Sequence, residues 1–232
     1  IMATFVKMHK MKGHIFTFGQ VYTIRDLNLP SRKLNQDFRD KVKIVFIDDE
    51  KFVYYDELIR SGFHITHYED VPDLQTLGEF GVIICDIKGV GKAFNSPSEG
   101  AYLIRELKKR YPYKIFAAYT GSTYDISLNS YLEGVHIIKK DIEIDDWCTE
   151  IDLLIKKSVD PRIIWETIRN TLIKEEVPTL MIAKLENDYV DILINKGGNF
   201  REFPSEKTLK VSSDVRSIIQ SLVANVIFSI IA

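Results

Sequence analysis

From Lys41 onward, short apolar runs alternate with longer stretches of helical spacing, and this alternation restricts the chain to few architectures. Strand-like runs occupy residues 42–47, 63–67, 81–85, 114–119 and 135–138. Helical spacing is found in residues 53–61, 73–80, 100–110, 126–133 and 145–157. Apolar strands that each lead into a helix are typical of a parallel sheet covered on both faces. The sequence therefore predicts an α/β domain over residues 41–158, a flavodoxin-like (βα)5 doubly wound parallel sheet.

The segments on either side of this domain are predicted to be an N-terminal arm and a small C-terminal α+β appendage. Residues 1–40 form a basic extension with one strand-like piece, residues 14–24. In residues 159–232, Asp160-Pro161 has the chemistry of a helix start, so a helix to about residue 175 is expected. Residues 179–184 and 189–195 alternate like a pair of strands, and a last helix is expected from about Ser213.

Composition and charge argue against several classes of protein. The 31 basic and 33 acidic residues give a net charge of −2, so no overall field favours nucleic acid or an anionic membrane. Cys85 and Cys148 are too few for a disulfide framework, and the N-terminus lacks the layout of a signal peptide, so a cytoplasmic protein is expected. The apolar stretch 218–232 is interrupted by polar residues and is read as an amphipathic helix, either packed or cut short.

Carboxylates follow two strands that a flavodoxin-like order makes neighbours. Asp48-Asp49-Glu50 ends the first strand and Asp86 ends the third, so these acids are expected to converge at one edge of the sheet. Unit charges about 4 Å apart repel by roughly 1–4 kcal/mol per pair, so a neutralising group is needed. Mg²⁺ suits such oxygen ligands, and no His or Cys residues stand at zinc spacing.

The fourth and fifth strands end in groups of the opposite character. The fourth is followed by Thr120-Gly121, a hydroxyl beside a residue that permits close approach, and the fifth by Lys139-Lys140. Carboxylates for a metal, one hydroxyl and one ammonium suit a phosphoryl group, because its transfer depends on positioning and charge neutralisation.

These residues, in this order, resemble the receiver domain of two-component response regulators over about half of the chain. The resemblance implies that Asp86 accepts a phosphoryl group and that Asp48, Asp49, Asp86 and the Lys88 carbonyl hold Mg²⁺. It implies that Thr120 and Lys139 grip the phosphoryl oxygens. A histidine kinase or another phosphodonor would then be a partner, and the chain would act as a phosphoacceptor rather than as an enzyme in its own right.

The sequence departs from the family pattern near the fifth strand and in one loop. Lys140 stands where receiver domains carry proline, so either lysine could meet the phosphate, with position favouring Lys139. His136 replaces the aromatic residue expected three places before that lysine, and the loop 87–100 is long and carries Gly89-Val90-Gly91-Lys92 without P-loop spacing.

Two other functions remain open. A haloacid dehalogenase type of phosphotransferase shares an aspartate nucleophile, but its second acid is replaced here by Lys88. The second alternative is a pseudo-receiver, a domain that binds protein partners without being phosphorylated. For the output, a protein partner or a homodimer through the C-terminal region is expected, and DNA is a lesser alternative because no second recognition helix follows.

Overall fold

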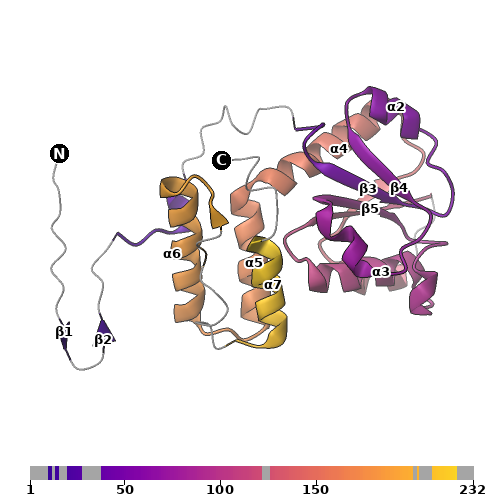
Figure 1. The fold of residues 1–232 in the computed structure, drawn as a ribbon. Coiled ribbons are helices and arrows are strands. Elements are labelled where there is room, and N and C mark those ends of the chain that lie inside the picture. Colours follow the sequence, from indigo (N-terminus) through magenta and orange to yellow (C-terminus); the bar gives the residue numbers. More distant parts are fainter. Residues whose placement is uncertain are drawn as a thin grey trace.

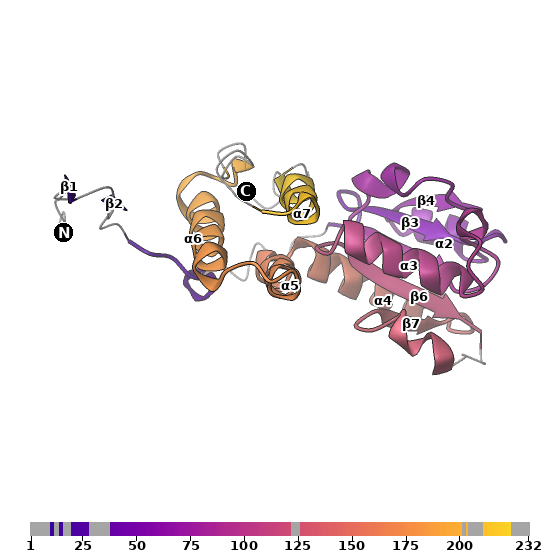
Figure 2. The same cartoon turned by 90° about the horizontal axis from the view of Figure 1, so that it is seen from below.

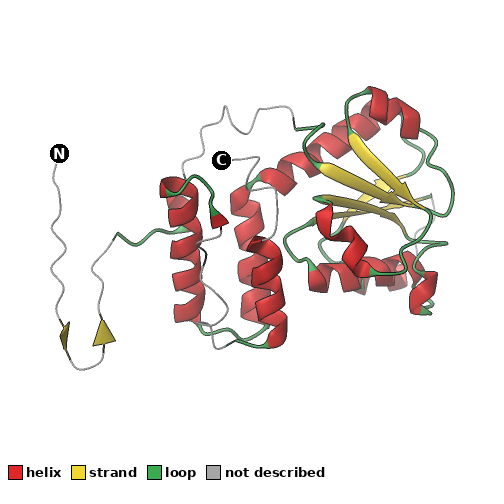
Figure 3. Ribbon diagram, in the orientation of Figure 1, coloured by secondary structure: helices red, strands yellow, loops and turns green. Residues whose placement is uncertain are grey.

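A five-stranded parallel sheet forms the middle layer of the α/β part of the molecule (Figures 1 and 3). The computed structural model describes residues 10–11, 14–15, 20–27, 38–121, 126–200, 203 and 211–223. The strands are β3 (Lys43–Ile47), β4 (His64–Tyr68), β5 (Val82–Asp86), β6 (Ile115–Thr120) and β7 (His136–Lys139), in the order β4-β3-β5-β6-β7. This is the flavodoxin-like order predicted from the sequence, and each strand lies within about a residue of its predicted bounds.

Helices cover both faces of the sheet. Helix α2 (Tyr55–Arg60) and helix α4 (Ile144–Val159) lie on one face, and α3 (Glu99–Arg110) lies on the other (Figure 1). Two connections expected to be helical, 73–80 and 126–133, contain the 3-10 helices η2 (Leu74–Glu79) and η4 (Ile126–Ser130) instead. These segments are too short for several α-helical turns, and a tight 3-10 turn closes such a link.

The core is built on the two central strands. Every side chain from Ile44 to Ile47 and from Val82 to Cys85 is fully buried, as expected for strands with both faces covered. Beside them, four aromatic rings, those of Phe46, Phe52, Tyr119 and Trp147, are in mutual contact with centroids 4.8–5.9 Å apart. This cluster joins β3 and β6 to α4.

The C-terminal part is helical where it is described. Helix α5 (Pro161–Lys174) begins as predicted, because the Asp160 side chain accepts from the Arg162 amide at 2.8 Å and Pro161 occupies the first position. Helix α7 (Ser213–Val223) also starts where expected. Its Ile218, Ile219 and Leu222 are buried, so this part of the apolar stripe is core, and the rest of the stripe lies outside the described residues.

The predicted strand pair at 179–195 is wrong. These residues form one helix, α6 (Thr179–Asn195). The apolar alternation was misleading because no Gly or Pro separates the two halves, and Ile182, Leu185 and Tyr189 recur at helical spacing and are buried. The Tyr189 ring stacks on Trp165 of α5 at 5.1 Å and its hydroxyl donates to the Pro161 carbonyl.

The described residues 20–27 of the N-terminal arm contact helix α6. A strand was predicted at residues 14–24. In the described part of this range, His14–Ile15 form the two-residue strand β2, which pairs with β1 (Lys10–Met11), and residues 20–23 are not strand. The amides of Tyr22 and Ile24 donate to Asn187 and Glu186 of α6 at 2.8 and 3.0 Å, just before and within η1 (Ile24–Asp26). The division into domains at residues 40 and 158 stays a prediction.

No helix in the described residues combines the length and apolar character needed to cross a bilayer.

Lys114, just before β6, closes the amino edge of the sheet, and we expect its loss to be costly. Its Nζ is buried and donates to the carbonyls of Leu77, Gly78 and Phe80. The variant Lys114→Met should lower the free energy of unfolding by about 2 kcal/mol, because buried carbonyls lose their donor. Urea denaturation measures this, and Lys156→Met, at an exposed lysine of α4, is the control. Equal stability of both variants would contradict the capping role.

Candidate functional site

Three carboxylates meet at the carboxyl edge of the sheet. Asp48 and Asp49 follow β3, and Asp86 ends β5, which pairs directly with β3 in a register that sets Ile47 beside Cys85. One oxygen from each acid lies within 4.8 Å of the others. The strand order thus brings Asp86 beside two acids that precede it in the chain by 37 and 38 residues.

Asp48 is buried and held by several donors. The Tyr119 hydroxyl donates to its Oδ2, and the Glu50 amide donates to Oδ1 at 3.0 Å. The His67 ring hydrogen-bonds to the Asp48 carbonyl at 2.9 Å, which fixes the backbone at the end of β3 against β4. Burial, followed by the bond to Asp48, raises the pKa of Tyr119, so this phenol remains a proton donor.

Asp86 is paired with an ammonium. Lys140 Nζ lies 2.6 Å from Asp86 Oδ2 and 3.5 Å from Asp48 Oδ2, and the Lys88 amide donates to Asp86 Oδ1 at 3.2 Å. Burial raises the pKa of Asp86, and the hydrogen bond and charge of Lys140 offset this in part. Burial acts to lower the pKa of Lys140, but Asp86 outweighs it and raises that pKa. The short contact is that of an ionised pair.

The ammonium at the site therefore belongs to Lys140 and not to Lys139, which the sequence analysis favoured. Ile138 is buried and Ile137 is 41% exposed, so alternation along β7 sends Lys139 to the exposed side and Lys140 toward the acids. Lys139 is paired in register with Thr120, whose side chain is buried, and the Lys140 amide donates to the Thr120 carbonyl at 2.9 Å. Thr120 lies at the same edge, as expected from its place at the end of β6.

Asp49 is exposed, and the loop that follows β5 contacts its carboxylate from one side. Lys92 Nζ lies 3.4 Å from Asp49 Oδ2. Gly89 has a φ of +76°, and a Cβ there would lie 2.3–2.4 Å from the atoms of the Asp49 carboxyl group. Glycine is thus required at this position both for its backbone conformation and for the approach of the acid.

The same loop is anchored rather than free. The amides of Gly91 and Lys92 donate to the Asp70 carboxylate at 2.6 and 3.1 Å, and the Gly89 amide donates to Glu99 at 2.7 Å. Gly100, in the first turn of α3, packs so closely on β5 that a Cβ would stand 1.9 Å from the Asp86 carbonyl oxygen. The long loop noted in the sequence is therefore held at both of its ends by these contacts.

Sequence reasoning missed Tyr119, Lys92, Asp70 and Glu99. Tyr119 was read only as part of a buried strand, although a tyrosine directly before Thr120 has its hydroxyl near the carboxyl edge of the sheet. Asp70 follows β4 and carries the same signal as Asp48 and Asp86, an acid just beyond a strand end. Lys92 lies in the long loop and Glu99 at the start of α3, where no periodic pattern predicts which way a side chain points.

The donor set fits a hard divalent cation. Asp48, Asp49 and Asp86 offer only oxygen atoms, which Mg²⁺ prefers. Lys140 and Lys92 already supply positive charge to these acids, so a cation would share or displace their contacts.

Comparison with known proteins gives a likeness of fold. No protein-family model matches the sequence, and no curated protein is a significant match. Among solved structures, NtrX from Brucella abortus is 20% identical with a TM-score of 0.44, over 62% of this chain and 32% of that one. Full-length FixJ from B. japonicum is 16% identical (TM-score 0.43, 79% and 88% covered). A CheY-like response regulator receiver domain protein from Methanospirillum hungatei JF-1 is 18% identical (TM-score 0.42, 50% and 95% covered).

The match therefore spans about a third of the NtrX chain. The flavodoxin-like class predicted from the sequence is confirmed by the strand order of the sheet.

The packing of Gly89 against Asp49 predicts a site-specific loss of stability. Gly89→Ala should lower the free energy of unfolding by at least about 1 kcal/mol, because the new Cβ meets the carboxylate and the positive φ becomes strained. Gly121→Ala is the matched control at the same edge, since its Cβ would meet nothing within 4 Å. Chemical denaturation of both variants measures the difference, and a Gly89→Ala protein as stable as Gly121→Ala would refute the close approach.

Proposed function

We propose that this chain is a phospho-accepting signalling receiver in which Asp86 takes a phosphoryl group from a histidine kinase or another phosphodonor. The observation that carries the proposal is the convergence of Asp48, Asp49 and Asp86 with the Lys140 ammonium at one edge of the sheet. The likeness of fold to response regulators, which is what the comparisons give, supports the same class.

Asp86 has the position and the chemistry of the acceptor. An oxygen of its ionised carboxylate attacks the phosphorus of the donor, the new O–P bond forms, and the leaving group departs with the electrons of the bond that breaks. A carboxylate nucleophile needs no base to activate it. The 2.6 Å contact keeps Lys140 beside the oxygen that reacts, where its charge stabilises the anionic phosphoryl oxygens.

Asp48, Asp49, Asp86 and the Lys88 carbonyl are the residues that would hold Mg²⁺. Bound there, the ion neutralises charge on the phosphoryl oxygens and helps to orient them. Asp49 is the exposed member of the three acids, whereas Asp48 is buried and its carboxylate accepts hydrogen bonds from Tyr119 and from the Glu50 amide. Thr120, at the end of β6, provides the hydroxyl for the remaining oxygen.

The response to phosphorylation would begin with the partners of Asp86. A phosphoryl group on Asp86 draws Lys140 and Thr120 toward new acceptors, and the two residues are already joined by the bond from the Lys140 amide to the Thr120 carbonyl. A change at this end of β6 and β7 would reach a protein partner or a second copy of the chain. Exposed apolar side chains on α5 and α6, those of Ile173, Leu180 and Ile194, support an interaction through the C-terminal part.

The central experiment is phosphorylation by acetyl phosphate, followed by intact mass and location of the modified peptide. We expect one added phosphoryl group on Asp86, dependent on Mg²⁺, and none in Asp86→Asn. Asp73→Asn, an exposed acid at the start of η2, is the control and should be labelled normally. A labelled Asp86→Asn protein would overturn the assignment of the acceptor.

The two neighbouring lysines give a sharper test of the geometry. Lys140→Gln should slow phosphorylation at least about tenfold, because it removes a charge aimed at the reacting oxygens. Lys139→Gln should react at nearly the wild-type rate, since its side chain is exposed and no contact with the acids is formed. Rates from quenched samples decide between them. The reverse order of effects would restore Lys139 to the role expected from the sequence.

A phosphorylation-independent interaction module is the second candidate. Lys140 and Lys92 already neutralise Asp86 and Asp49, which favours an acid cluster that is stable without a metal or a phosphoryl group. The same mass measurement separates the two functions, because a module of this kind would gain no mass from acetyl phosphate at any Mg²⁺ concentration.

A further inference from the structure

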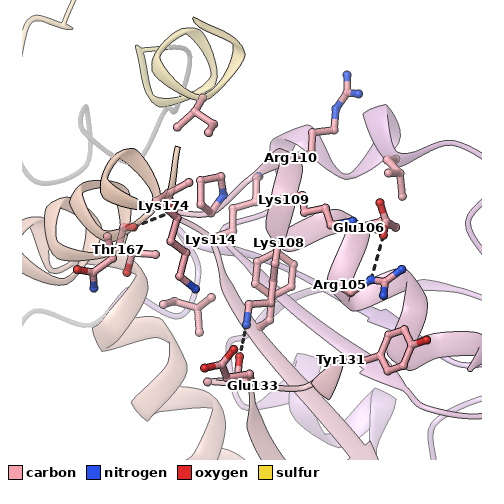
Figure 4. A pocket seen from close by; sticks show the side chains of 18 of the residues that line it. Arg105, Glu106, Lys108, Lys109, Arg110, Lys114, Tyr131, Glu133, Thr167 and Lys174 are labelled. Atoms are coloured by element: carbon pink, nitrogen blue, oxygen red, sulfur yellow. Dashed lines mark hydrogen bonds and ion pairs between the residues drawn. The ribbon is translucent and has the colours of Figure 1, made fainter. Parts of the chain in front are cut away.

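A second concave site lies at the opposite edge of the sheet from the acids. It is a cleft of about 890 Å³ bordered by the start of β6, the end of α3, and helices α5 and α7 (Figure 4). Figure 2 shows α5 and α7 beside the sheet domain, and Figure 3 shows the strand arrowheads pointing away from them. The volume falls within the roughly 300–1,000 Å³ of typical small-molecule sites.

The lining of the cleft is rich in cations. Its charged side chains are Arg105, Lys108, Lys109, Arg110, Lys114, Lys157 and Lys174 on the positive side, and Glu106, Glu133, Glu175 and Asp214 on the negative side. The donors of Lys114 are occupied by backbone carbonyls, as described above. Glu106 accepts from Lys109 at 2.8 Å and from Arg105 at 3.1 Å, so this carboxylate is already shared by two cations.

Three lysines of the cleft have no carboxylate partner. Within the part of the chain that the structure describes, no ion pair is formed by Lys108, Lys157 or Lys174. Lys108 Nζ donates instead to the backbone carbonyl of Glu133. Burial lowers the pKa of Lys108, and the charge of Lys174 adds to this while Glu133 opposes it. Ammonium groups on α3 and α5 thus repel each other across the cleft.

The partial charges of the helix ends do not neutralise the positive charge of the cleft. The carboxyl-terminal ends of α3, α4 and α5 border the cleft, and each carries roughly half a negative charge, while the amino-terminal end of α7 contributes roughly half a positive charge. With Lys114 left out, six cations face four carboxylates, and the four helix ends together reduce this difference to an excess of about one positive charge. The excess is concentrated on Lys108, Lys157 and Lys174, which come from three different helices.

We propose that this cleft binds a small organic polyanion of the phosphate-ester class through Lys108 of α3, Lys157 of α4 and Lys174 of α5. Three ammonium groups on separate walls suit an anion with several charged oxygens, which can meet all of them at once. Asn170 of α5 and Ser217 of α7 also line the cleft and can donate to further oxygens. The bound anion would join the sheet domain to helix α5, and this binding does not depend on phosphorylation of Asp86.

The test is a calorimetric titration of the full chain with inorganic pyrophosphate in buffer free of divalent metal. We expect saturable binding of one anion, weakened by added salt. Lys174→Gln and Lys157→Gln should each raise the Kd about tenfold or more, which is the loss of one hydrogen bond to a charged group. Lys156→Gln is the matched control, because Lys156 is the exposed neighbour of Lys157 on the same helix and does not line the cleft.

The variant Asp86→Asn separates this site from the proposed phosphorylation site. Pyrophosphate binding should be unchanged in Asp86→Asn, since the acids lie at the other edge of the sheet. Absence of saturable binding up to about 10 mM pyrophosphate, which is weaker than typical specific sites, would overturn the proposal. An equal loss of affinity in Lys156→Gln and Lys157→Gln would also overturn it, because the anion would then respond only to net charge.

Discussion

Mutual repulsion among Asp48, Asp49 and Asp86 is the constraint that organises the carboxyl edge of the sheet. Burial of two of these acids would be unfavourable without donors and positive charge close by. The chain supplies both: Tyr119 and backbone amides donate hydrogen bonds, and Lys140 and Lys92 bring ammonium groups from two different loops. Most of the unusual local features follow from this need, including the glycine at 89 and the anchoring of the loop that carries Lys92.

The three acids are held close together because the two central strands that carry them, β3 and β5, are tightly packed. Both central strands are buried on their two faces, and the aromatic cluster of Phe46, Phe52, Tyr119 and Trp147 fills the space between the sheet and α4. Tyr119 belongs to this cluster through its ring and to the site through its hydroxyl. A change in the charge at Asp48 therefore acts directly on a group that is packed in the core.

Periodicity and strand ends were enough to predict the sheet and its acids, because buried parallel strands leave long apolar runs and their carboxyl ends share one edge. The choice between Lys139 and Lys140 was harder, since it depends on which face of β7 each residue occupies. Local alternation also led to the wrong prediction of a strand pair at 179–195. These residues form one helix, in which Tyr189 packs on Trp165. The hydroxyl of Tyr119 and the loop contacts of Asp70 have no periodic signal, because they arise only when distant segments meet.

Helix α3 connects the two edges of the sheet domain. Its first turn presses Gly100 against the carbonyl of Asp86, and its last turn brings Lys108 and Arg110 to the basic cleft. Twelve residues of α-helix form a rod about 18 Å long that contains no Gly or Pro beyond its first turn. A tilt of this rigid helix at the Asp86 end would therefore displace Lys108 and Arg110 at its other end.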